Sequence, residues 1–447
     1  MKIIRGYEEA RDLLQKRQIQ ELAPSEAILD RLKVLFGKPT TPQEAVAQIL
    51  QDVREKGDAA LVDYSKRIDG SEMTRFEVTV REIEKAYSHT SLELVEALEL
   101  AAKRIRAFHE SYTTRTWVDF SKGWGQLVRP LDRVGLYVPG GRAAYPSTVL
   151  MTAIPAKVAG VPEIVLTTPP DAEGNANPLV LAAARVAGID RVFKVGGAQA
   201  IGALAYGTES IPRVDKICGP GNLFVVLAKR AVYGSVGIDA LHGPTEGAVL
   251  ADATADPEIC AADLVAQAEH DELASAILIT NHEPLLDSVA AAMERQLATL
   301  ERASVIRGAL ERNGLFIYVP TLEEGAELAS LLAPEHLSIL TADPWSLVGR
   351  VRHAGALFLG STVSASLGDY VAGPSHVMPT GATARFSSPL RTEDFMKVTS
   401  VVALDAATGA DIAPAAAAIA RAEGLTAHAR AIEMHQHLSG ESGLARD

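Results

Sequence analysis

The sequence predicts an α/β protein built from two incomplete doubly wound parallel sheets, with small helical extensions at its N- and C-terminal ends. Short apolar runs, typical of strands buried on both faces, alternate with longer stretches of helical periodicity. The alternation occurs twice and restarts after Gly243-Pro244. Because strands that alternate with crossover helices pair in parallel, each series predicts one sheet with helices on both faces.

Composition limits the class of protein. The chain has 447 residues, of which 47% are apolar and 22% charged, enough apolar material for several folded domains. Its formal net charge is -13, and no basic block predicts nucleic-acid binding. Neither a membrane-spanning run nor a secretion signal is expected. The only cysteines, Cys218 and Cys260, are far apart, so we expect a cytoplasmic protein without disulfides or a thiolate zinc site.

The first hundred residues are predicted to be mostly helical. Apolar residues recur at helical spacing, with Lys, Arg and Glu between them, in residues 42–69 and 92–112. Near Gly123 the pattern changes to short β-type runs over residues 126–130 and 134–138. A new region therefore begins close to this glycine.

Two α/β series follow. The first has predicted strands at residues 164–167, 192–195 and 214–218 and predicted helices at 179–187, 198–206 and 223–233. The second has strands at 249–251, 276–280, 315–319, 337–340 and 356–359 and helices at 261–269, 285–300 and 322–332. From about residue 389 the chain is predicted to be helical except at 400–404, and Ala-rich residues 413–421 are typical of close helix packing. The predicted parts are residues 1–40, a helical extension; 41–136 with 247–388, a first α/β domain; 137–246, a second; and 389–447, a helical tail.

Glycine-rich turns after predicted strands are candidate binding loops, because free helix N–H groups and missing Cβ atoms let an anion approach. Three such turns occur, at residues 139–142, 196–199 and 219–222. None satisfies the dinucleotide fingerprint, since Phe224 stands where a third small residue belongs. Taken singly, each is equally well a tight turn without a ligand.

Two pairs of polar residues lie at ends of predicted elements. Gln267 and His270 close a predicted helix at a spacing that points both side chains the same way, although a solvent-facing helix end has the same pattern. Glu335 and His336 lie on a turn before a predicted strand. A buried carboxyl and imidazole at a sheet edge can carry two proton transfers, whereas an exposed pair would be a surface turn.

Two further pairs lie in the last third of the chain. Asp369 and His376 are in a long loop interrupted by Gly and Pro, a kind of segment that is functional or disordered. Glu423 and His428 flank a predicted helix–helix junction, with Gly424 as the stop of the first helix. Together, Gln267, His270, Asp369 and His428 offer mixed nitrogen and oxygen donors without thiolate, which suits zinc with positions left for a substrate.

These residues carry a resemblance to a known family. Motifs that occur in order over about nine tenths of the chain make it similar to the histidinol dehydrogenase family. They are Gly135-Leu136-Tyr137-Val138-Pro139-Gly140-Gly141, Val195-Gly196-Gly197-Ala198-Gln199-Ala200-Ile201, Lys216-Ile217-Cys218-Gly219-Pro220-Gly221-Asn222, Gln267-Ala268-Glu269-His270, Ala333-Pro334-Glu335-His336-Leu337, Gly368-Asp369-Tyr370, His376-Val377-Met378-Pro379-Thr380 and Glu423-Gly424-Leu425-Thr426-Ala427-His428.

The resemblance implies two Rossmann-like domains and a zinc enzyme that oxidises L-histidinol to L-histidine with two NAD through an aldehyde, in histidine biosynthesis. It implies one Zn2+ per subunit and an intertwined homodimer in which His428 and Glu423 come from the partner subunit. The site residues it implies are Gln267, His270, Asp369 and His428 as zinc ligands; Glu335 and His336 as the acid/base pair; these ligands with His336, Thr245, His376 and Glu423 as substrate contacts; and Tyr137, Gln199 and Asn222 as NAD contacts.

Two departures from the family pattern bear on substrate identity. In the run His242-Gly243-Pro244-Thr245, Thr245 stands where the family usually has Ser. His242 stands where the family commonly has a small residue. Ser364 and Ala365 stand where a Pro-Glu pair is frequent. Two alternatives therefore stay open: a paralogue that oxidises another polar alcohol, such as a sulfonated diol, and a non-catalytic metal-binding derivative.

Overall fold

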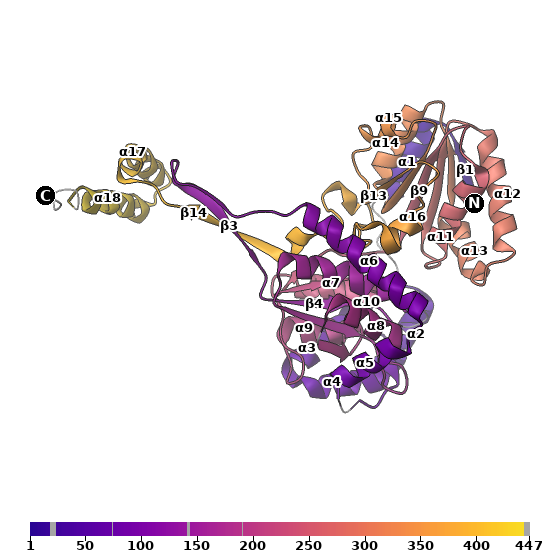
Figure 1. Cartoon of the computed structure of the whole chain (residues 1–447), viewed down its shortest axis with the longest axis horizontal. Helices are drawn as coiled ribbons and strands as arrows, with labels where there is room; N and C mark the ends of the chain where they lie inside the picture. The colour runs from indigo at the N-terminus through magenta and orange to yellow at the C-terminus, as the bar shows by residue number, and fades with distance from the viewer. Residues whose placement is uncertain (18–23, 74, 141–143, 190, 442–447) are drawn as a thin grey trace. The chain divides into compact units, whose positions relative to one another are not determined.

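The computed structural model describes residues 1–17, 24–73, 75–140, 144–189 and 191–441, with side chains up to residue 436. Contacts divide the chain into two units. The core unit consists of Met1–Thr113 and Leu131–Phe395, and the tail unit of Thr114–Pro130 and Met396–Asp447. Figure 1 labels the elements of both.

The first sheet of the core unit has six parallel strands in the order β1-β11-β10-β9-β12-β13. Chain order from β9 onward places its first strand in the centre and the later strands outward on either side, which is the doubly wound pattern. The N-terminal strand β1 adds to one edge. Its strands are β1 (Lys2–Arg5), β9 (Glu246–Ala251), β10 (Ser275–Thr280), β11 (Leu315–Tyr318), β12 (His336–Leu340) and β13 (Ala356–Leu359).

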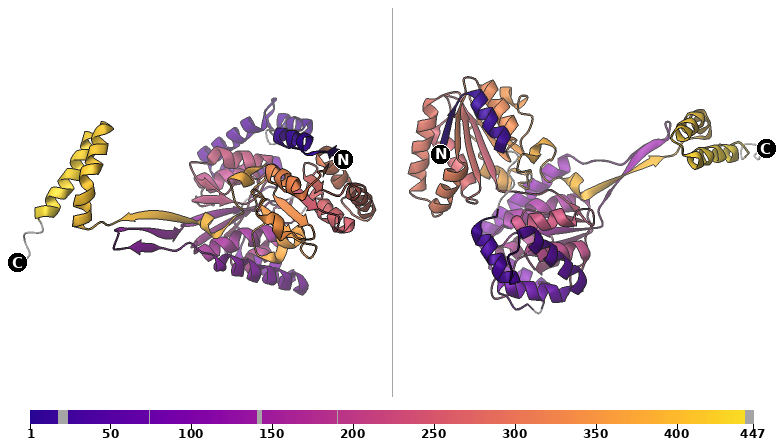
Figure 2. Two further views of the ribbon diagram at one scale, coloured as in Figure 1. Left: turned by 90° about the horizontal axis from the view of Figure 1, so that it is seen from above. Right: turned by 180° about the vertical axis from the view of Figure 1, so that it is seen from behind.

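Helices cover both faces of this sheet, as Figure 2 shows. Neighbouring strand residues face opposite layers: Val249 and Leu278 pack with one set of helices, whereas Leu250 and Ile279 pack with the other. The first layer is α11 (Pro257–Ala268), α12 (Pro284–Leu297) and α13 (Ala303–Asn313). The second is α1 (Tyr7–Arg17), α14 (Leu322–Leu332) and α15 (Trp345–Val348).

The second sheet has five parallel strands in the order β6-β5-β4-β7-β8, the same winding as the first. Its strands are β4 (Arg133–Tyr137), β5 (Glu163–Thr168), β6 (Arg191–Lys194), β7 (Lys216–Cys218) and β8 (Gly237–Ile238). Its crossover helices are α7 (Pro146–Ala159), α8 (Pro178–Ala187), α9 (Gly197–Tyr206) and α10 (Leu223–Val232). The prediction of two doubly wound parallel sheets is confirmed.

The N-terminal helices belong with the five-stranded sheet, which corrects the predicted grouping of residues 41–136 with 247–388. Val46, Ile49 and Val53 form one apolar stripe that packs against Ile201 and Leu204. An apolar stripe does not specify which sheet it covers, so the sequence pattern gave no basis for the choice. These helices are α2 (Glu26–Phe36), α3 (Pro42–Lys56), α4 (Asp58–Tyr64), the π-helix η1 (Ser65–Asp69), α5 (Val80–His89) and α6 (Leu92–Ser111).

Two helices of more than ten residues were not predicted, α7 and α13. Nearly every residue of α7 is buried, so it lacks the polar face that makes a helix recognisable in a sequence. Residues 1–17 also differ from the predicted extension, because β1 and α1 are part of the six-stranded layer.

The tail unit pairs a three-stranded antiparallel sheet with two helices. The order of its strands is β14-β3-β2, so residues 114–130 join the C-terminal residues, which the predicted boundary at 389 did not foresee. Ala417, Ala420 and Ala429 pack between the helices, as the Ala-rich segment predicted, and Gly424 in the left-handed region ends the first helix. The elements are β2 (Trp117–Asp119), β3 (Trp124–Pro130), β14 (Met396–Val402), α17 (Ala406–Ala422) and α18 (Thr426–Glu441).

Short elements connect β13 to β14. They are α16 (Ala365–Leu367), the π-helix η2 (Gly368–Ala372) and the 3-10 helices η3 (Thr383–Arg385) and η4 (Thr392–Phe395). Among the described helices, none is both long and apolar enough to cross a membrane.

Candidate active site

Glu335 and His336 lie at the amino edge of the six-stranded sheet. Ala333, in the left-handed region at φ 51°, ends α14 and turns the chain through Pro334 into β12. His336 is in register with Gly247 of β9, the strand at which the winding of the sheet reverses. Thr245, which precedes β9, therefore reaches the same point: its hydroxyl donates a short hydrogen bond to Glu335 Oε2.

Gln267 arrives at this edge because α11 runs back across the sheet after β9. Its side chain is buried, and its Oε1 lies 3.2 Å from Thr245 Oγ1. Gly247 makes the approach possible, since a Cβ there would lie 2.4 Å from Gln267 Cγ. His270 follows just beyond the end of α11, in the exposed turn that its N–H forms with the Gln267 carbonyl.

Asp369 and His376 lie next to this pair. The predicted irregular loop is instead a π-helix, η2, at Asp369, a local form that is common at functional sites. Asp369 Oδ1 lies 2.9 Å from His336 Nε2. His376 Nδ1 contacts the Asp369 carbonyl oxygen at 2.7 Å, and its Nε2 lies 3.2 Å from Thr148 Oγ1. The core unit thus brings four separate chain segments together.

The predicted acid/base pair, Glu335 and His336, is buried and strongly polarised. Glu335 is only 8% exposed, and its Oε2 accepts a hydrogen bond from the Glu246 N–H at 3.2 Å. Burial alone would lower the pKa of His336, but the hydrogen bond to Asp369 and the charges of Asp369 and Glu335 outweigh it and raise this pKa to about 10. Burial would raise the pKa of Asp369, yet His336 lowers it below its ordinary value.

Two supporting residues were not identified from the sequence. Asp263, four residues before Gln267 on α11, accepts a hydrogen bond from Ser338 Oγ at 2.7 Å. Ser338 is two positions after His336 on β12, so the pair lies behind the imidazole on the same face of the sheet. Burial raises the pKa of Asp263 despite that hydrogen bond. The sequence signal that could have identified Asp263 is an acidic residue in the middle of an otherwise apolar helix.

The glycine-rich turns lie at the carboxyl edge of the five-stranded sheet, whereas Glu335 and His336 lie at the amino edge of the six-stranded sheet. The Tyr137 hydroxyl at the end of β4 accepts a hydrogen bond from the Gly197 N–H at 3.1 Å. Gly219, at φ 117°, passes so close to Tyr137 that a Cβ would lie 2.1 Å from its carbonyl oxygen. Asn222 caps α10 by accepting from the Phe224 and Val225 N–H groups. Two of the three predicted turns, at residues 196–199 and 219–222, therefore both contact Tyr137.

Gln199, in the first turn of α9, is 0% exposed, and neither amide atom has a hydrogen-bond partner within the described residues. A buried amide of this kind is one that a bound molecule can satisfy. In the third predicted turn, residues 141 and 142 lie outside the described residues.

Glu423 and His428 belong to the tail unit. Glu423 is the last cap residue of α17, and His428 lies in the first turn of α18; both side chains are exposed. Across the part of the chain that is described, no three His, Cys, Asp or Glu side chains are clustered as a metal would need. Cys218 and Cys260 are buried and unbonded, as predicted.

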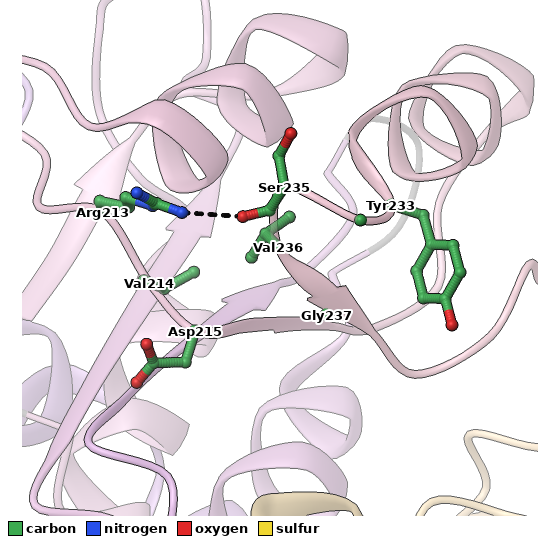
Figure 3. A pocket seen from close by; sticks show the side chains of 8 residues that line it. Arg213, Val214, Asp215, Tyr233, Ser235, Val236 and Gly237 are labelled. Atoms are coloured by element: carbon green, nitrogen blue, oxygen red, sulfur yellow. Dashed lines mark hydrogen bonds between the residues drawn. The ribbon is translucent and has the colours of Figure 1, made fainter. Parts of the chain in front are cut away.

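A separate hollow of about 380 Å³ lies at the amino ends of β7 and β8, as Figure 3 shows. There the Arg213 guanidinium donates to the Ser235 carbonyl at 2.8 Å. None of the predicted site residues lines this hollow; its lining residues are Arg213, Val214, Asp215, Tyr233, Gly234, Ser235, Val236 and Gly237.

Comparison with known proteins identifies the family. The histidinol dehydrogenase family profile matches residues 38–436. Histidinol dehydrogenase of Deinococcus radiodurans is 50% identical over 437 residues, covering 97% of this chain and 99% of that protein. That of Dehalococcoides mccartyi is 49% identical over 433 residues, with the same coverage. A crystal structure of histidinol dehydrogenase from Elizabethkingia anophelis superposes with a TM-score of 0.89 at 35% identity, covering 97% of each chain. The chain is a member of the histidinol dehydrogenase family.

Proposed function

We propose that this enzyme oxidises L-histidinol to L-histidine in two successive NAD-dependent steps, through an aldehyde that stays bound. The observation that supports this most is the buried pair of Glu335 and His336, next to Thr245, Gln267 and Asp369, in a chain of this family. Two proton-transfer groups side by side match a reaction with two oxidations.

Zinc fits the available donors. Gln267 and Asp369 offer oxygen donors, and His270 offers a nitrogen donor. Both cysteines are buried and are not part of this set of donors. Because the core unit supplies only one His and one Asp of this set, we infer that His428 of the tail unit completes it, with one ion per subunit. Zinc bound here would hold the amino and imidazole nitrogens of the substrate and draw charge from Asp369.

The roles of the protein side chains follow from their positions. In the first step the alcohol carbon gives a hydride to NAD, and we assign the hydroxyl proton to the imidazole of His336, which must be neutral to accept it. A cation held by Asp369 would offset the carboxylate charge that raises the pKa of His336 and so would favour this neutral form. In the second step Glu335 removes a proton from the water that adds to the aldehyde, and the hydrate gives a second hydride to a second NAD. Thr245 holds the Glu335 carboxylate, while His376 and Glu423 contact the substrate.

For NAD we propose the carboxyl edge of the five-stranded sheet. Tyr137, Gln199 and Asn222 lie at the amino ends of α9 and α10 or next to them, where the positive ends of the helix dipoles favour phosphate. The unpaired amide of Gln199 supports a bound partner at this position.

We also propose a homodimer in which Glu423 and His428 complete the site of the partner subunit. The tail unit leaves many large apolar side chains exposed, and exposed apolar surface often marks a protein–protein interface. Its exposed apolar side chains include Trp117, Phe120, Trp124, Val398, Val402, Ile412, Ile419, Leu425 and Met434.

The assay that tests the reaction measures NADH formed per L-histidinol consumed. We expect a ratio close to two, loss of turnover after chelation, and recovery with zinc. Turnover of a sulfonated diol in place of histidinol would contradict the proposed substrate.

Subunit mixing tests the shared site. Glu335→Gln and His428→Ala subunits should each be inactive alone. Refolded together in equal amounts, they should recover about a quarter of wild-type activity, because about half of the dimers are mixed and one of the two sites in each mixed dimer combines an intact core unit with an intact tail unit. No recovery from verified mixed dimers would show that each tail completes its own site.

A further inference from the structure

A buried network of charges lies beside the turn at Gly219, and the proposed reaction uses none of its members. Its members are Lys229 of α10, Asp239 after β8 and His242. Lys229 is 1% exposed and His242 7% exposed. An ion pair and an imidazole removed from water together are costly unless their hydrogen bonds are satisfied, so their contacts indicate what they are built to hold.

Asp239 is the centre of the network. It accepts hydrogen bonds from the N–H groups of Gly219 and Ala240, each at 2.7 Å, and forms a short ion pair with Lys229. Lys229 Nζ also donates to the Gly219 carbonyl at 2.9 Å. Burial would raise the pKa of Asp239, but Lys229 and His242 hold it well below its usual range. Gly219, the first residue of the proposed cofactor turn, is therefore held at both its N–H and its carbonyl.

His242 connects this network to the substrate side. Its Nε2 lies 3.2 Å from Asp239 Oδ2, and its Nδ1 lies 2.9 Å from the Met378 carbonyl oxygen. Both partners are acceptors, so each ring nitrogen faces a group to which it can donate a hydrogen bond. Next to it, the Gly243 N–H donates to Thr380 Oγ1 at 2.6 Å.

The ring thus joins three segments that the reaction needs in fixed relation. One is the turn at Gly219; another leads within three residues to Thr245; the third carries His376, two residues before Met378. Hydride transfer depends steeply on how donor and acceptor are placed, and an error of about 1 Å can cost about a hundredfold in rate.

We propose that His242 is a positioning residue that ties the cofactor turn at Gly219 to the substrate-binding segments at Thr245 and His376 through its two opposed hydrogen bonds. The inference rests on the proposed function for the roles of those segments. Lys229 and two backbone N–H groups continue to pair Asp239 when the imidazole is removed, so a variant at this position leaves no unpaired buried charge.

Three substitutions separate the two bonds. His242→Asn keeps a donor near Nδ1 and breaks the bond to Asp239; His242→Gln keeps a donor near Nε2 and breaks the bond to Met378; His242→Ala removes both. His89→Ala, at an exposed helix end, is the matched control. Each variant is assayed as the zinc-loaded enzyme with NAD and with histidinol deuterated at its alcohol carbon.

We expect His242→Ala to lower kcat about ten- to a hundredfold, with the single-bond variants in between, and to enlarge the deuterium isotope effect because hydride transfer becomes slower. Zinc content, thermal unfolding midpoint and the control variant should stay near wild type. A purely structural role would reduce the folded fraction without changing the isotope effect.

Wild-type kcat and isotope effect in folded His242→Asn and His242→Gln would overturn the inference even if His242→Ala failed to fold. In that case wild-type turnover of histidinol would leave the proposed function standing. A wild-type enzyme that does not oxidise histidinol would overturn both together.

Discussion

The two sheets of the core unit share one winding but carry their candidate site residues at opposite edges. In the six-stranded sheet the proposed acid/base pair lies at the amino edge, at the start of β12. In the five-stranded sheet the glycine-rich turns lie at the carboxyl edge, after β6 and β7. Sheets of this kind usually bind ligands at the carboxyl edge, so the six-stranded sheet departs from the general rule.

Helix polarity explains the difference. At the amino edge of the six-stranded sheet, α11 and α14 end, and helix C-termini carry partial negative charge that favours cations. At the carboxyl edge of the five-stranded sheet, α9 and α10 begin, and their N-termini favour anions. One winding therefore offers a cation-binding edge and an anion-binding edge, which suits a metal on one sheet and a dinucleotide on the other.

The largest effect is expected from a substitution at the amino edge of the six-stranded sheet. Glu335→Gln keeps the size of the side chain but removes its capacity to take a proton, so kcat should fall about a thousandfold, equivalent to about 4 kcal/mol. Steady-state NADH formation measures this, with the exposed Glu327→Gln of α14 as control. A variant within about tenfold of wild type would move the proton transfers to another residue.

The next effect concerns the carboxyl edge. Gln199→Leu keeps the volume and removes both amide groups, so KM for NAD should rise about ten- to a hundredfold while kcat changes little. Titration of NADH fluorescence checks the same loss directly. The surface variant Gln51→Leu, which loses only its bond to Glu55, should bind as wild type does. Unchanged NAD affinity in Gln199→Leu would remove this residue from the proposed cofactor site.

A smaller effect concerns stability near Tyr137. Burial raises the pKa of Asp69 to about 6, well above its ordinary value, despite Arg31 nearby. The folded protein therefore holds this proton more tightly than the unfolded chain, and the carboxyl lowers stability progressively as pH rises from about 4 to about 6. Asp69→Asn should gain about 1–2 kcal/mol at pH 7.5 and nothing at pH 4. Denaturant unfolding at both pH values measures it, against Asp30→Asn; an equal gain at both would contradict the assignment.

The smallest effect sharpens the description of Thr245. Thr245→Ser keeps the hydroxyl that donates to Glu335 and removes only a methyl group, so kcat/KM for histidinol should change less than about threefold. Thr245→Val, which keeps the shape and loses the donor, should cost about tenfold or more. Equal effects of both substitutions would mean that pocket shape, and not the hydroxyl, governs this position.

Sequence patterns were sufficient for most strands of the two parallel sheets, because a buried parallel strand is a short apolar run whatever surrounds it. They did not predict β1, β2 or β8, which are short strands at sheet edges. They were insufficient for α7, which is apolar on all sides, and for the partner of the stripe at Val46, Ile49 and Val53, since an apolar face does not specify what covers it. The division into domains was misplaced for this reason.

The same limit applies to the candidate site: neighbours in the sequence could be predicted, and contacts between distant segments could not. Glu335 and His336 are adjacent in the sequence and were recognised as a pair. The contact between His336 and Asp369 joins residues 33 positions apart, and it depends on the register of β12 and on a π-helix that no local pattern predicted. Asp263 and Ser338 escaped notice because their importance lies in facing each other across two elements.

The pairing of β14 with β3 has a consequence for how the enzyme can be shortened. The polypeptide passes between the core and tail units three times, after Thr113, Pro130 and Phe395. A cut near residue 389 would leave β2 and β3 behind as a hairpin whose long edge, stripped of β14, is open to adhesion between molecules. The tail unit is consequently not a module that can be removed by shortening the chain from one end.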